Sequence, residues 1–491
     1  MEKNIVFINK KVSSIEKILE VSGDIIVPDI KPDIVSVINT NGIPYIYKED
    51  ITIGRVRFDG NIDTYVVYLA DSGETRSLTA SLSFSDSIEN GSITDTCFIK
   101  QEVILNKIES KVLNERKISI KASLKVKTEI FEKTQVEIAS DFEEIGFLEK
   151  LKETISVKSL VGANRVKTSI KEDIAVDNSY LPVEILKTQV EITNLENKIS
   201  YNKVLAKADA LVKIIFLSDD GRIGVASSNI PIMSFIDVEN VTDSNECMID
   251  YITRNMLFKV NAKESRTIAC QIEFEVMCSV YETKTIDVIQ DMYGIKNELK
   301  FTKKEALVPI AGNSKSQKIN INERVQIEDI LNVLDVNVNL KKINSTKSGS
   351  NYNAECEATL EVFFEADNRN GLNIKEITLP FMVKLENDEN INFEIINKQF
   401  TVNNENVNCD MEILVKKDKD QMKNIAIIEN VEANMLDEED DYKMFMYFVK
   451  PGDSIWEIAK KFKVCKNDII SLNKLENPDK INVGDRLYIM R

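Results

Sequence analysis

The sequence predicts a mainly β protein with short helices, in which three similar β-rich units in tandem are followed by a small βααβ module. Three observations lead to this fold class. Long stretches alternate apolar and polar residues, which is typical of antiparallel strands with one buried face. One pattern of strands and turns recurs along residues 1–418. Residues 446–491 carry a different pattern, in which turn residues alternate with short helical segments.

Each unit contains a β-hairpin pattern. The run from Ile51 to Gly73 aligns with the run from Ile199 to Gly221, and the two glycines are 148 positions apart. A third copy begins at Tyr352 and reaches Gly371, another 150 positions on. Each run alternates apolar and polar residues, ends in a polar turn that contains glycine, and is followed by a second such run. The repeat therefore predicts three related hairpins.

A later strand in each unit shows the same alternation over a greater length. In the first unit, lysines and serines separate the apolar residues, so one face of the strand is expected to be buried. The cysteines of this pattern are expected in the core. The residues expected on the buried faces are Ile118, Ile120, Ala122, Leu124 and Val126, then Ile268, Cys270, Ile272, Phe274, Val276, Cys278 and Val280, and finally Val407, Cys409, Met411, Ile413 and Val415.

The boundaries follow from these repeats and from local helix signals. Ser140 and Glu143 have the spacing of a capping box, which predicts a helix that ends near Glu153. The acidic run Asp437–Asp441 is typical of a solvated linker. The predicted organisation is unit 1 at 1–135, a connecting helix and strand at 136–164, unit 2 at 165–296, unit 3 at 297–418, an acidic linker at 419–445 and the C-terminal module at 446–491.

Composition restricts the function. The net charge is −17, and because residues 446–491 carry +3, the remainder carries −20. A body this acidic argues against binding to nucleic acid or to anionic lipid. The chain has no histidine, so Ser-His or Cys-His nucleophile pairs and histidine zinc sites are excluded. We therefore expect a protein that is not an enzyme and has no cofactor and no metal site.

Targeting and redox signals point to the cytosol. The N-terminus has an acidic second residue and no apolar stretch of the kind that a signal peptide needs. No run approaches the length of a membrane span, so no membrane insertion is expected. Seven cysteines without a Cys-x-x-Cys pair fit a reducing compartment better than a disulfide framework.

The C-terminal pattern resembles a LysM module almost from end to end. This resemblance implies a βααβ fold and a recognition function without chemistry of its own. The matching segments are Tyr447-Phe-Val-Lys-Pro-Gly-Asp-Ser454, Ile458-Ala459, Leu472-Asn473, Asn477-Pro-Asp-Lys-Ile481 and Gly484-Asp-Arg-Leu-Tyr-Ile489.

In LysM modules that bind N-acetylglucosamine polymers, two loops form the groove, so the resemblance implies a binding site here. An alternative is that the same residues only make the turns of the fold. Trp456, the single tryptophan, either contacts a ligand or packs in the core. The candidate partner- or glycan-binding residues are Gly452, Asp453, Ser454, Ile455, Trp456, Lys466, Asn477, Pro478, Asp479, Lys480 and Ile481.

Cys465 and Lys466 depart from the LysM pattern, which usually has Ser or Thr followed by a small apolar residue. Cys465 is expected at the N-cap of the second helix, where a thiol caps poorly. A thiol at a helix N-terminus can be reactive. The alternative is that Cys465 is a tolerated small residue.

The tandem units resemble the SPOCS repeat of clostridial spore-coat proteins. The resemblance rests on the entry Pro28-Asp-Ile-Lys-Pro-Asp33, on the hairpins and on Asp291-Met-Tyr-Gly294. SPOCS repeats followed by one LysM resemble the coat morphogenetic proteins. This implies a scaffold in the mother-cell cytoplasm, at the outer surface of the forespore.

The resemblance also implies partners. The LysM module would bind the ATPase of the coat basement layer, and the body would bind other coat proteins. The absence of an export signal favours a protein partner over a glycan. The alternative is a cell-wall or cortex protein whose LysM module holds peptidoglycan.

Overall fold

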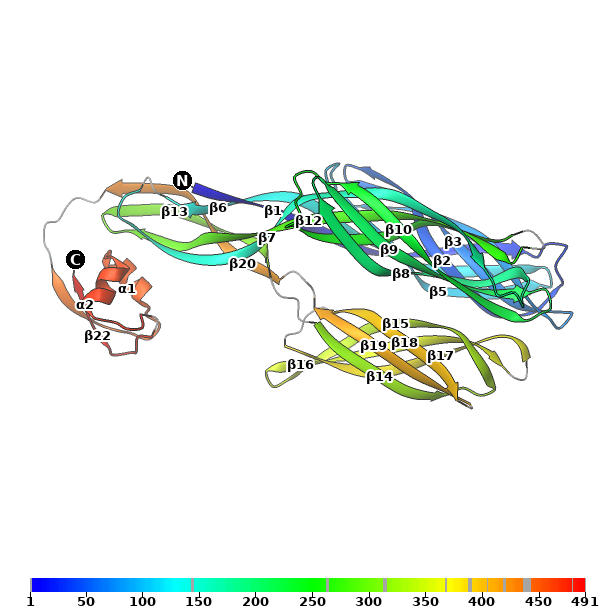
Figure 1. Ribbon diagram of the computed structural model, residues 1–491. Helices are drawn as coiled ribbons and strands as arrows, with labels where there is room; N and C mark the ends of the chain where they lie inside the picture. Colours follow the sequence, from blue (N-terminus) through cyan, green and yellow to red (C-terminus); the bar gives the residue numbers. More distant parts are fainter. Residues whose placement is uncertain are drawn as a thin grey trace.

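The computed structural model describes residues 2–142, 145–261, 265–311, 316–366, 369–386, 391–403, 405–417, 421–435, 443–478 and 480–490 (Figure 1). Within these residues the chain forms 22 strands and two short helices. The mainly β fold class with a C-terminal βααβ module is therefore confirmed. The β strands form three similar units, which we call units 1, 2 and 3.

Unit 1 has two three-stranded antiparallel sheets, β2-β3-β4 and β1-β6-β5. The first strand of the unit, β1, pairs with the last, β6, along most of its length. The strands are β1 (Glu2–Ile26), β2 (Ile34–Thr52), β3 (Arg55–Ala70), β4 (Thr75–Glu89), β5 (Phe98–Asn114) and β6 (Lys117–Asp141).

Unit 2 repeats this topology. One sheet is β10-β9-β8, and in the other the first strand β7 pairs with the last strand β12, which also pairs with β11. The strands are β7 (Leu148–Ala175), β8 (Pro182–Ser200), β9 (Lys203–Ser218), β10 (Ile223–Asp237), β11 (Glu246–Val260) and β12 (Thr267–Gly294).

Unit 3 has the same plan, but its first and last strands are each divided in two. The sheets β15-β16-β17 and β14-β19-β18 form the unit, and β13 pairs with β20. The strands are β13 (Asn297–Ile310), β14 (Ser316–Gln326), β15 (Ile330–Ser348), β16 (Asn351–Ala366), β17 (Arg369–Leu385), β18 (Ile391–Asn403), β19 (Asn406–Lys417) and β20 (Gln421–Met435).

The strand faces expected from the alternation are confirmed. The residues of β6, β12 and β19 that were predicted to be buried are at most 2% exposed, and Cys270, Cys278 and Cys409 lie in the core with them. Gly73 and Gly221 have φ values of +82° and +83° in the turns after β3 and β9, as expected for hairpin turns that need glycine. Gly371 of the third copy lies within strand β17 rather than in a turn.

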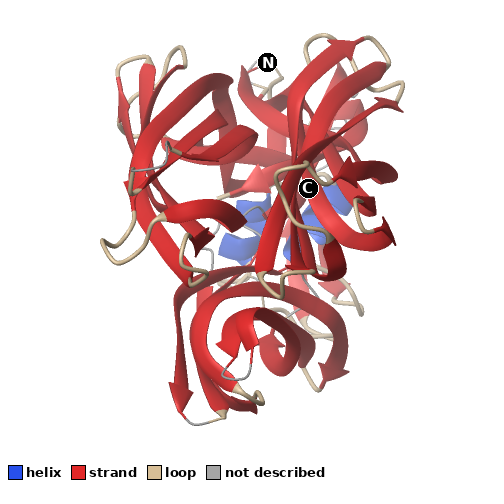
Figure 2. Cartoon of the chain, turned by 90° about the vertical axis from the view of Figure 1, so that its right-hand side faces the viewer, coloured by secondary structure: helices blue, strands red, loops and turns tan. Residues whose placement is uncertain are grey.

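The three units pack against one another rather than forming a loose chain, and viewed end-on they surround a common centre (Figure 2). A shared apolar cluster contains Val67 of unit 1, Leu217 of unit 2 and Phe363 of unit 3. Buried ion pairs lie between the units: Arg254 pairs with Glu49 across units 1 and 2, and Lys187 with Asp335 across units 2 and 3. Pairing compensates charges that would be costly to bury alone.

Beyond the units, the paired ends of their first and last strands continue as a narrow bundle, which we call the stalk (Figure 1). The stalk consists of the paired ends of β1 and β6, of β7 and β12, and of β13 and β20. These three ribbons share one core. Its buried residues are Val6, Ile8, Val136, Ile138, Ile155, Val157, Ile286, Val288, Val308 and Ile425.

The stalk corrects two of the predicted segments. The helix predicted from Ser140 to Glu153 is wrong where the structure describes it, because Leu148 already begins strand β7. Residues Glu143 and Glu144 lie outside the described residues. Strand β7 pairs with β12 along its whole length, and this long-range pairing outweighs a local capping signal. The connecting segment at 136–164 is thus divided between β6 and β7.

The predicted linker at 419–445 is also wrong over Gln421–Met435, which forms strand β20. Ile425 and Ile428 are buried in the stalk, whereas Asn424 and Glu432 are exposed. A polar strand of this kind is easily mistaken for a linker when its partner strand is distant in the sequence. The acidic run Asp437–Asp441 lies outside the described residues. In the structure unit 1 extends to Asp141, unit 2 begins at Leu148 and unit 3 ends at Met435.

The C-terminal module has the predicted βααβ order: β21 (Met444–Phe448), α1 (Ile455–Phe462), α2 (Lys466–Leu472) and β22 (Arg486–Met490). Strands β21 and β22 pair in an antiparallel ribbon. Ser454 is the N-cap of α1, and its side-chain oxygen accepts a hydrogen bond from the Glu457 backbone N–H at 3.1 Å. Cys465 is the N-cap of α2 without a side-chain capping bond, as expected for a thiol.

Candidate functional site

The first predicted loop of the module is exposed at its tip and firmly held at its base. Gly452 and Ser454 are exposed, and Gly452 has a φ of +86°, which requires glycine. The Asp453 carboxylate accepts hydrogen bonds from the Lys450 backbone N–H and the Tyr447 hydroxyl, both at 2.8 Å. These bonds hold the pKa of Asp453 below its usual range. The loop is a preformed, solvent-facing surface.

The second predicted loop is also open to solvent. Asn477 and Lys480 are exposed, Pro478 is half-buried, and Asp479 lies outside the described residues. The Lys480 backbone N–H donates to the Asn477 carbonyl oxygen at 3.2 Å. Ile481 packs on the same apolar cluster that contains Ile455, which follows the first loop. The two loops are thus joined through a shared core, and Ile455, at 2% exposed, belongs to that core rather than to the surface.

Trp456 lies at a junction between the module and the stalk. Its side chain is 7% exposed, and its indole Nε1–H donates to Asp291 Oδ2 at 3.0 Å. Its ring meets the ring of Tyr293 edge-on, with 5.0 Å between centroids. Asp291 and Tyr293 belong to β12 of unit 2. In the intact chain Trp456 therefore packs against the body and is not presented to solvent.

Asp291 is the electrostatic centre of this junction. Lys460 of α1 reaches its Oδ2 at 2.5 Å, and Lys303 of β13 reaches its Oδ1 at 2.9 Å. Burial alone would raise the pKa of Asp291, but the hydrogen bonds from Lys460, Lys303 and Trp456 outweigh it and lower the pKa to about 2. Asp291 thus remains ionised and joins unit 2, unit 3 and the module.

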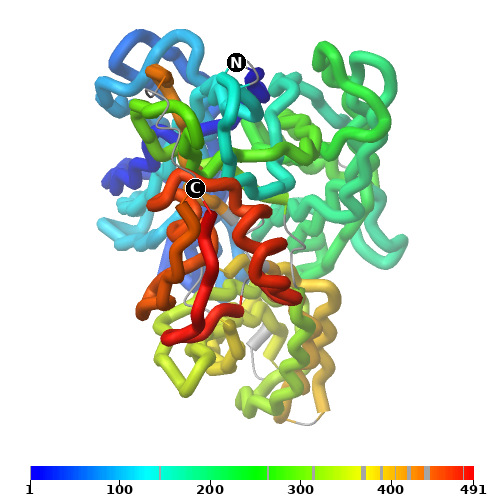
Figure 3. The backbone as a smooth tube through the Cα atoms, turned by 90° about the vertical axis from the view of Figure 1, so that its left-hand side faces the viewer, coloured from blue at the N-terminus to red at the C-terminus, as the bar shows by residue number. Residues whose placement is uncertain are grey.

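Further apolar and hydrogen-bonded contacts complete the junction. We call the residues of the body at this junction the LysM seat; they are Leu151, Asp291, Tyr293, Ile295 and Lys303. The Tyr293 hydroxyl donates to the Val464 carbonyl oxygen at 2.7 Å, and Leu151 and Ile295 pack on the core of the module. Figure 3 shows the module in red, below the end of the stalk.

A β-bulge in β12 orients the LysM seat. Ile289 pairs with Lys152 and Asp291 pairs with Leu151, so Gln290 is an extra residue. Beyond the bulge, Met292 packs into the stalk while Asp291 and Tyr293 face the module. The bulge therefore turns the Asp291-Met-Tyr-Gly294 motif towards the C-terminal domain.

Cys465 and Lys466, the two departures from the LysM pattern, lie beside this junction. Both are half-buried. Burial and a hydrogen bond with Glu149 of β7 raise the pKa of the Cys465 thiol. A raised pKa disfavours the thiolate, so Cys465 fits a packing role better than a reactive one.

Sequence reasoning identified both halves of the junction without joining them. Asp291 and Tyr293 were recognised as part of a repeat motif, and Trp456 as a residue with two open roles. A local signal was present: Asp291 interrupts an apolar strand and is only 7% exposed, which indicates a buried partner. The identity of that partner could not be read from the sequence, because 165 positions separate Asp291 from Trp456.

Acid is expected to release the module from the seat. Because hydrogen bonds from Lys460, Lys303 and Trp456 lower the pKa of Asp291 from 3.8 to about 2, the contribution of the ionised carboxylate is fully present above pH 3.8 and is lost as the pH falls towards about 2. Trp456 is the only tryptophan, so its fluorescence reports docking directly. We expect a red shift of its emission in this pH range, and this shift should be absent in Asp291→Asn. An identical shift in that variant would assign the acid transition to other groups.

Comparison with known protein families agrees with this architecture. The family model described as SipL, SPOCS domain matches residues 183–261, which span β8 to β11 of unit 2. The LysM domain model matches residues 447–489. No curated protein sequence matches the chain. No helix among the described residues is long and apolar enough to cross a membrane.

The SPOCS match thus lies in one of the three β-rich units, and the LysM match covers the C-terminal module. More specifically, the chain has a SPOCS domain of the SipL type in unit 2 and a LysM domain at residues 447–489, which is the architecture that the sequence predicted. Both families are non-catalytic binding or scaffold domains. The SipL-type domain indicates association with the spore coat, and together the two domains support a sporulation-associated coat scaffold.

Proposed function

We propose that this protein is a non-enzymatic scaffold of sporulation that assembles the spore coat and tethers it around the forespore. Its LysM module binds the ATPase of the coat basement layer. The observation that carries the proposal is a SipL-type SPOCS domain and a LysM domain in one chain, with the LysM domain held at the tip of a stalk. In this position Gly452 and Ser454 of the first loop and Lys480 of the second are exposed.

Charge supports a protein partner. The module carries +3 and the body −20, so the module is the part of the chain suited to an acidic surface. The exposed Lys480 lies in the second loop. A polymerised ATPase layer offers many copies of one site, and several scaffolds bound along it gain from avidity even when each contact is weak.

The seat gives the module a fixed orientation. Lys460, Trp456 and Val464 contact the body, whereas Gly452, Ser454 and Lys480 are exposed. A LysM module that is already held in one orientation does not lose further conformational freedom when the partner binds, and this reduces the entropic cost of association. The residues expected to contact the ATPase are therefore the two loops, and Trp456 would act by positioning them.

Binding of the full chain to the coat ATPase of the same organism tests this function. We expect Lys480→Ala to weaken binding about tenfold, or about 1.4 kcal/mol, because it removes an exposed charge from the second loop. Lys474→Ala is the matched control, since it removes the same charge from an exposed position of the module outside both loops. Equal affinity of the two variants would contradict a role for this loop.

Localisation during sporulation is the second test. A fluorescent fusion of the full chain is expected to surround the forespore, and a fusion ending at Met435 is expected to remain dispersed. Normal localisation of the truncated chain would show that tethering does not need the LysM module.

A glycan-binding function is the second candidate, favoured by the LysM match and by the exposure of Gly452 and Ser454. In this alternative the module holds N-acetylglucosamine units of peptidoglycan in the cortex. Purified peptidoglycan and chito-oligosaccharide belong in the same binding assay as the ATPase. Tight binding to glycan without binding to the ATPase would replace the proposed function with this one.

A further inference from the structure

Two cysteines of unit 2 lie next to each other in neighbouring strands. Cys247 of β11 and Cys278 of β12 have their sulfur atoms 3.1 Å apart and are both free thiols. Cys247 is opposite Val280 and Cys278 is opposite Ile249, so the two are diagonal neighbours on one face of the sheet. Cys278 is 1% exposed, whereas Cys247 is half-buried. One sulfur is therefore accessible and the other lies directly behind it.

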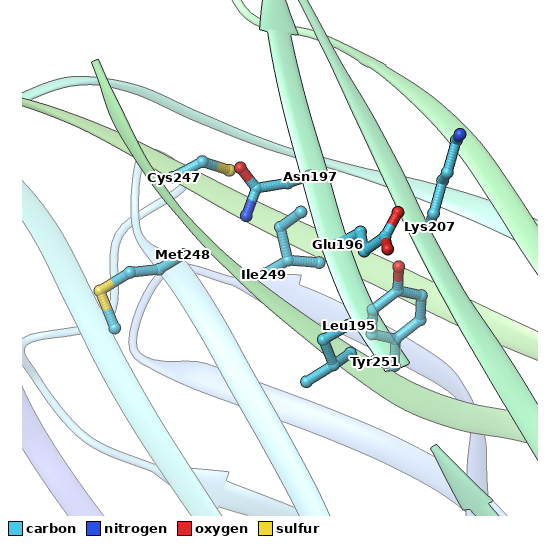
Figure 4. Close-up of a pocket in the computed structure, with 8 residues that line it drawn as sticks. All are labelled: Leu195, Glu196, Asn197, Lys207, Cys247, Met248, Ile249 and Tyr251. Carbon is cyan, nitrogen blue, oxygen red and sulfur yellow. The ribbon is translucent and has the colours of Figure 1, made fainter. Parts of the chain in front are cut away.

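A small cavity leads to Cys247. It has a volume of about 190 Å³ and lies between β8 and β11, with Asn197, Glu196, Lys207 and Tyr251 also in its wall (Figure 4). The hydroxyl of Tyr251 is buried and has no hydrogen-bond partner within the described part of the chain. A polar molecule in the cavity would find an unused hydroxyl, a carboxylate and an ammonium group there.

A local distortion of β8 accompanies this cavity. Thr193 pairs with Asp209 and Glu196 pairs with Lys207, so two residues of β8 oppose a single residue of β9. Asn194, one of the two, has a φ of +52°, and its amide donates to the Asp209 carboxylate at 2.8 Å. The bulge places Leu195 and Glu196 at the cavity. The cavity thus belongs to the regular fold of unit 2 and is preformed.

We propose that Cys247 and Cys278 form a reactive thiol pair, in which Cys247 reacts with a hydroperoxide that enters the cavity and Cys278 then closes a disulfide. In the first step the Cys247 thiolate attacks one peroxide oxygen; an S–O bond forms, the O–O bond breaks and hydroxide leaves, to be protonated to water when the peroxide is hydrogen peroxide. In the second step the Cys278 sulfur attacks the sulfenic sulfur, the S–S bond forms and water leaves. Two thiols lose two electrons, and the peroxide is reduced.

The environment of the two thiols supports these roles. A hydrogen bond from Cys278 lowers the pKa of Cys247, whereas the same interaction and burial raise that of Cys278. By contrast, burial raises the pKa of Cys270 to about 12 and those of Cys356 and Cys409 to about 11. Cys247 is thus the favoured nucleophile, and these three buried cysteines serve as internal controls.

The disulfide would fasten strand β11, at the edge of its sheet, to the central strand β12. It would close a loop between positions 31 apart in sequence. It would also make the cavity narrower. Oxidation at this position would lock unit 2 without altering the LysM seat.

The test uses the intact chain and hydrogen peroxide, followed by alkylation and mass spectrometry. We expect a linked Cys247–Cys278 peptide, two hydrogens lighter than the reduced pair. It should form at least about tenfold faster than Cys356 or Cys409 oxidises, because the thiolate fraction falls about tenfold for each unit by which a pKa rises. Oxidation of all these cysteines at similar rates, or linkage between two copies of the chain, would overturn the proposal.

Two variants separate the steps. In Cys278→Ser, Cys247 should stop at the sulfenic acid and be captured by dimedone, whereas Cys247→Ser should leave Cys278 reduced. No sulfenic acid at Cys247 in the first variant would refute its role as nucleophile. Leu195→Trp, at the exposed bulge, is a further variant that keeps both thiols and should slow oxidation by obstructing the cavity. Since it alters no buried position, it tests the entry route even if a serine variant folds poorly.

Discussion

Replacing Asp291 with alanine is expected to release the LysM module, and the emission of Trp456 should then shift to longer wavelength. The substitution leaves the indole N–H, Lys460 and Lys303 without their shared acceptor. Buried hydrogen bonds to a charged group contribute about 1.5–3 kcal/mol each, but Lys460 and Lys303 are more than one third exposed and solvent screens them. We expect docking to weaken by about 2–3 kcal/mol. Fluorescence with acrylamide quenching measures it, because the chain has one tryptophan.

Asp287→Ala is the matched control for this substitution. Asp287 lies on the same strand, four residues before Asp291, and its carboxylate accepts a hydrogen bond from Thr154 at 2.7 Å. Removing it should leave the emission of Trp456 unchanged. If Asp291→Ala has the same emission and quenching as this control, the apolar contacts of Tyr293, Leu151 and Ile295 alone hold the module.

Replacing Asp335 with alanine is expected to separate unit 3 from unit 2 at a cost of about 3–5 kcal/mol, the range for removing one partner of a buried ion pair. Asp335 and Lys187 are 5% and 2% exposed, and their side chains are 2.6 Å apart. Lys213 reaches the other carboxylate oxygen at 2.7 Å, and the Lys187 ammonium lies 3.6 Å from the centroid of Phe363. Burial would raise the pKa of Asp335, but the two lysines lower it. Without Asp335, Lys187 is a buried and uncompensated charge.

Urea unfolding and limited proteolysis measure this loss, with cleavage expected in unit 3 at lower urea concentration. Asp410→Ala, on an exposed position of β19, is the control for removing an aspartate from unit 3. The double variant Lys187→Met with Asp335→Leu should recover much of the stability, because it removes both charges and keeps the volume filled. If Asp335→Ala unfolds at the same urea concentration as Asp410→Ala, the apolar cluster around Phe363 alone maintains the interface.

The order of domains and the buried faces of the strands could be predicted because they depend on local patterns. Alternation with a period of two assigns Ile118 to Val126 to one face, whatever strand lies beside them. The same local reasoning failed at Leu148–Glu153 and at Gln421–Met435. There the partner strand, β12 or β13, is needed to tell a strand from a helix or a linker.

The candidate site divides in the same way. The turn glycine Gly452 and the helix-capping Ser454 were predictable, since a positive φ and a helix cap are properties of a few consecutive residues. The burial of Trp456 was not predictable, since it depends on a contact with the body.

By itself the sequence determined a chain of β-rich repeats with alternating strand faces, an acidic body, and a basic LysM module at its C-terminus. Only the tertiary structure decided that Trp456 packs on Tyr293, that Asp335 joins two units, and that Cys247 lies beside Cys278. The physical reason is the range of the interactions. Backbone alternation and turns act between near neighbours, whereas the energy of a buried charge or ring depends on the groups that packing brings around it.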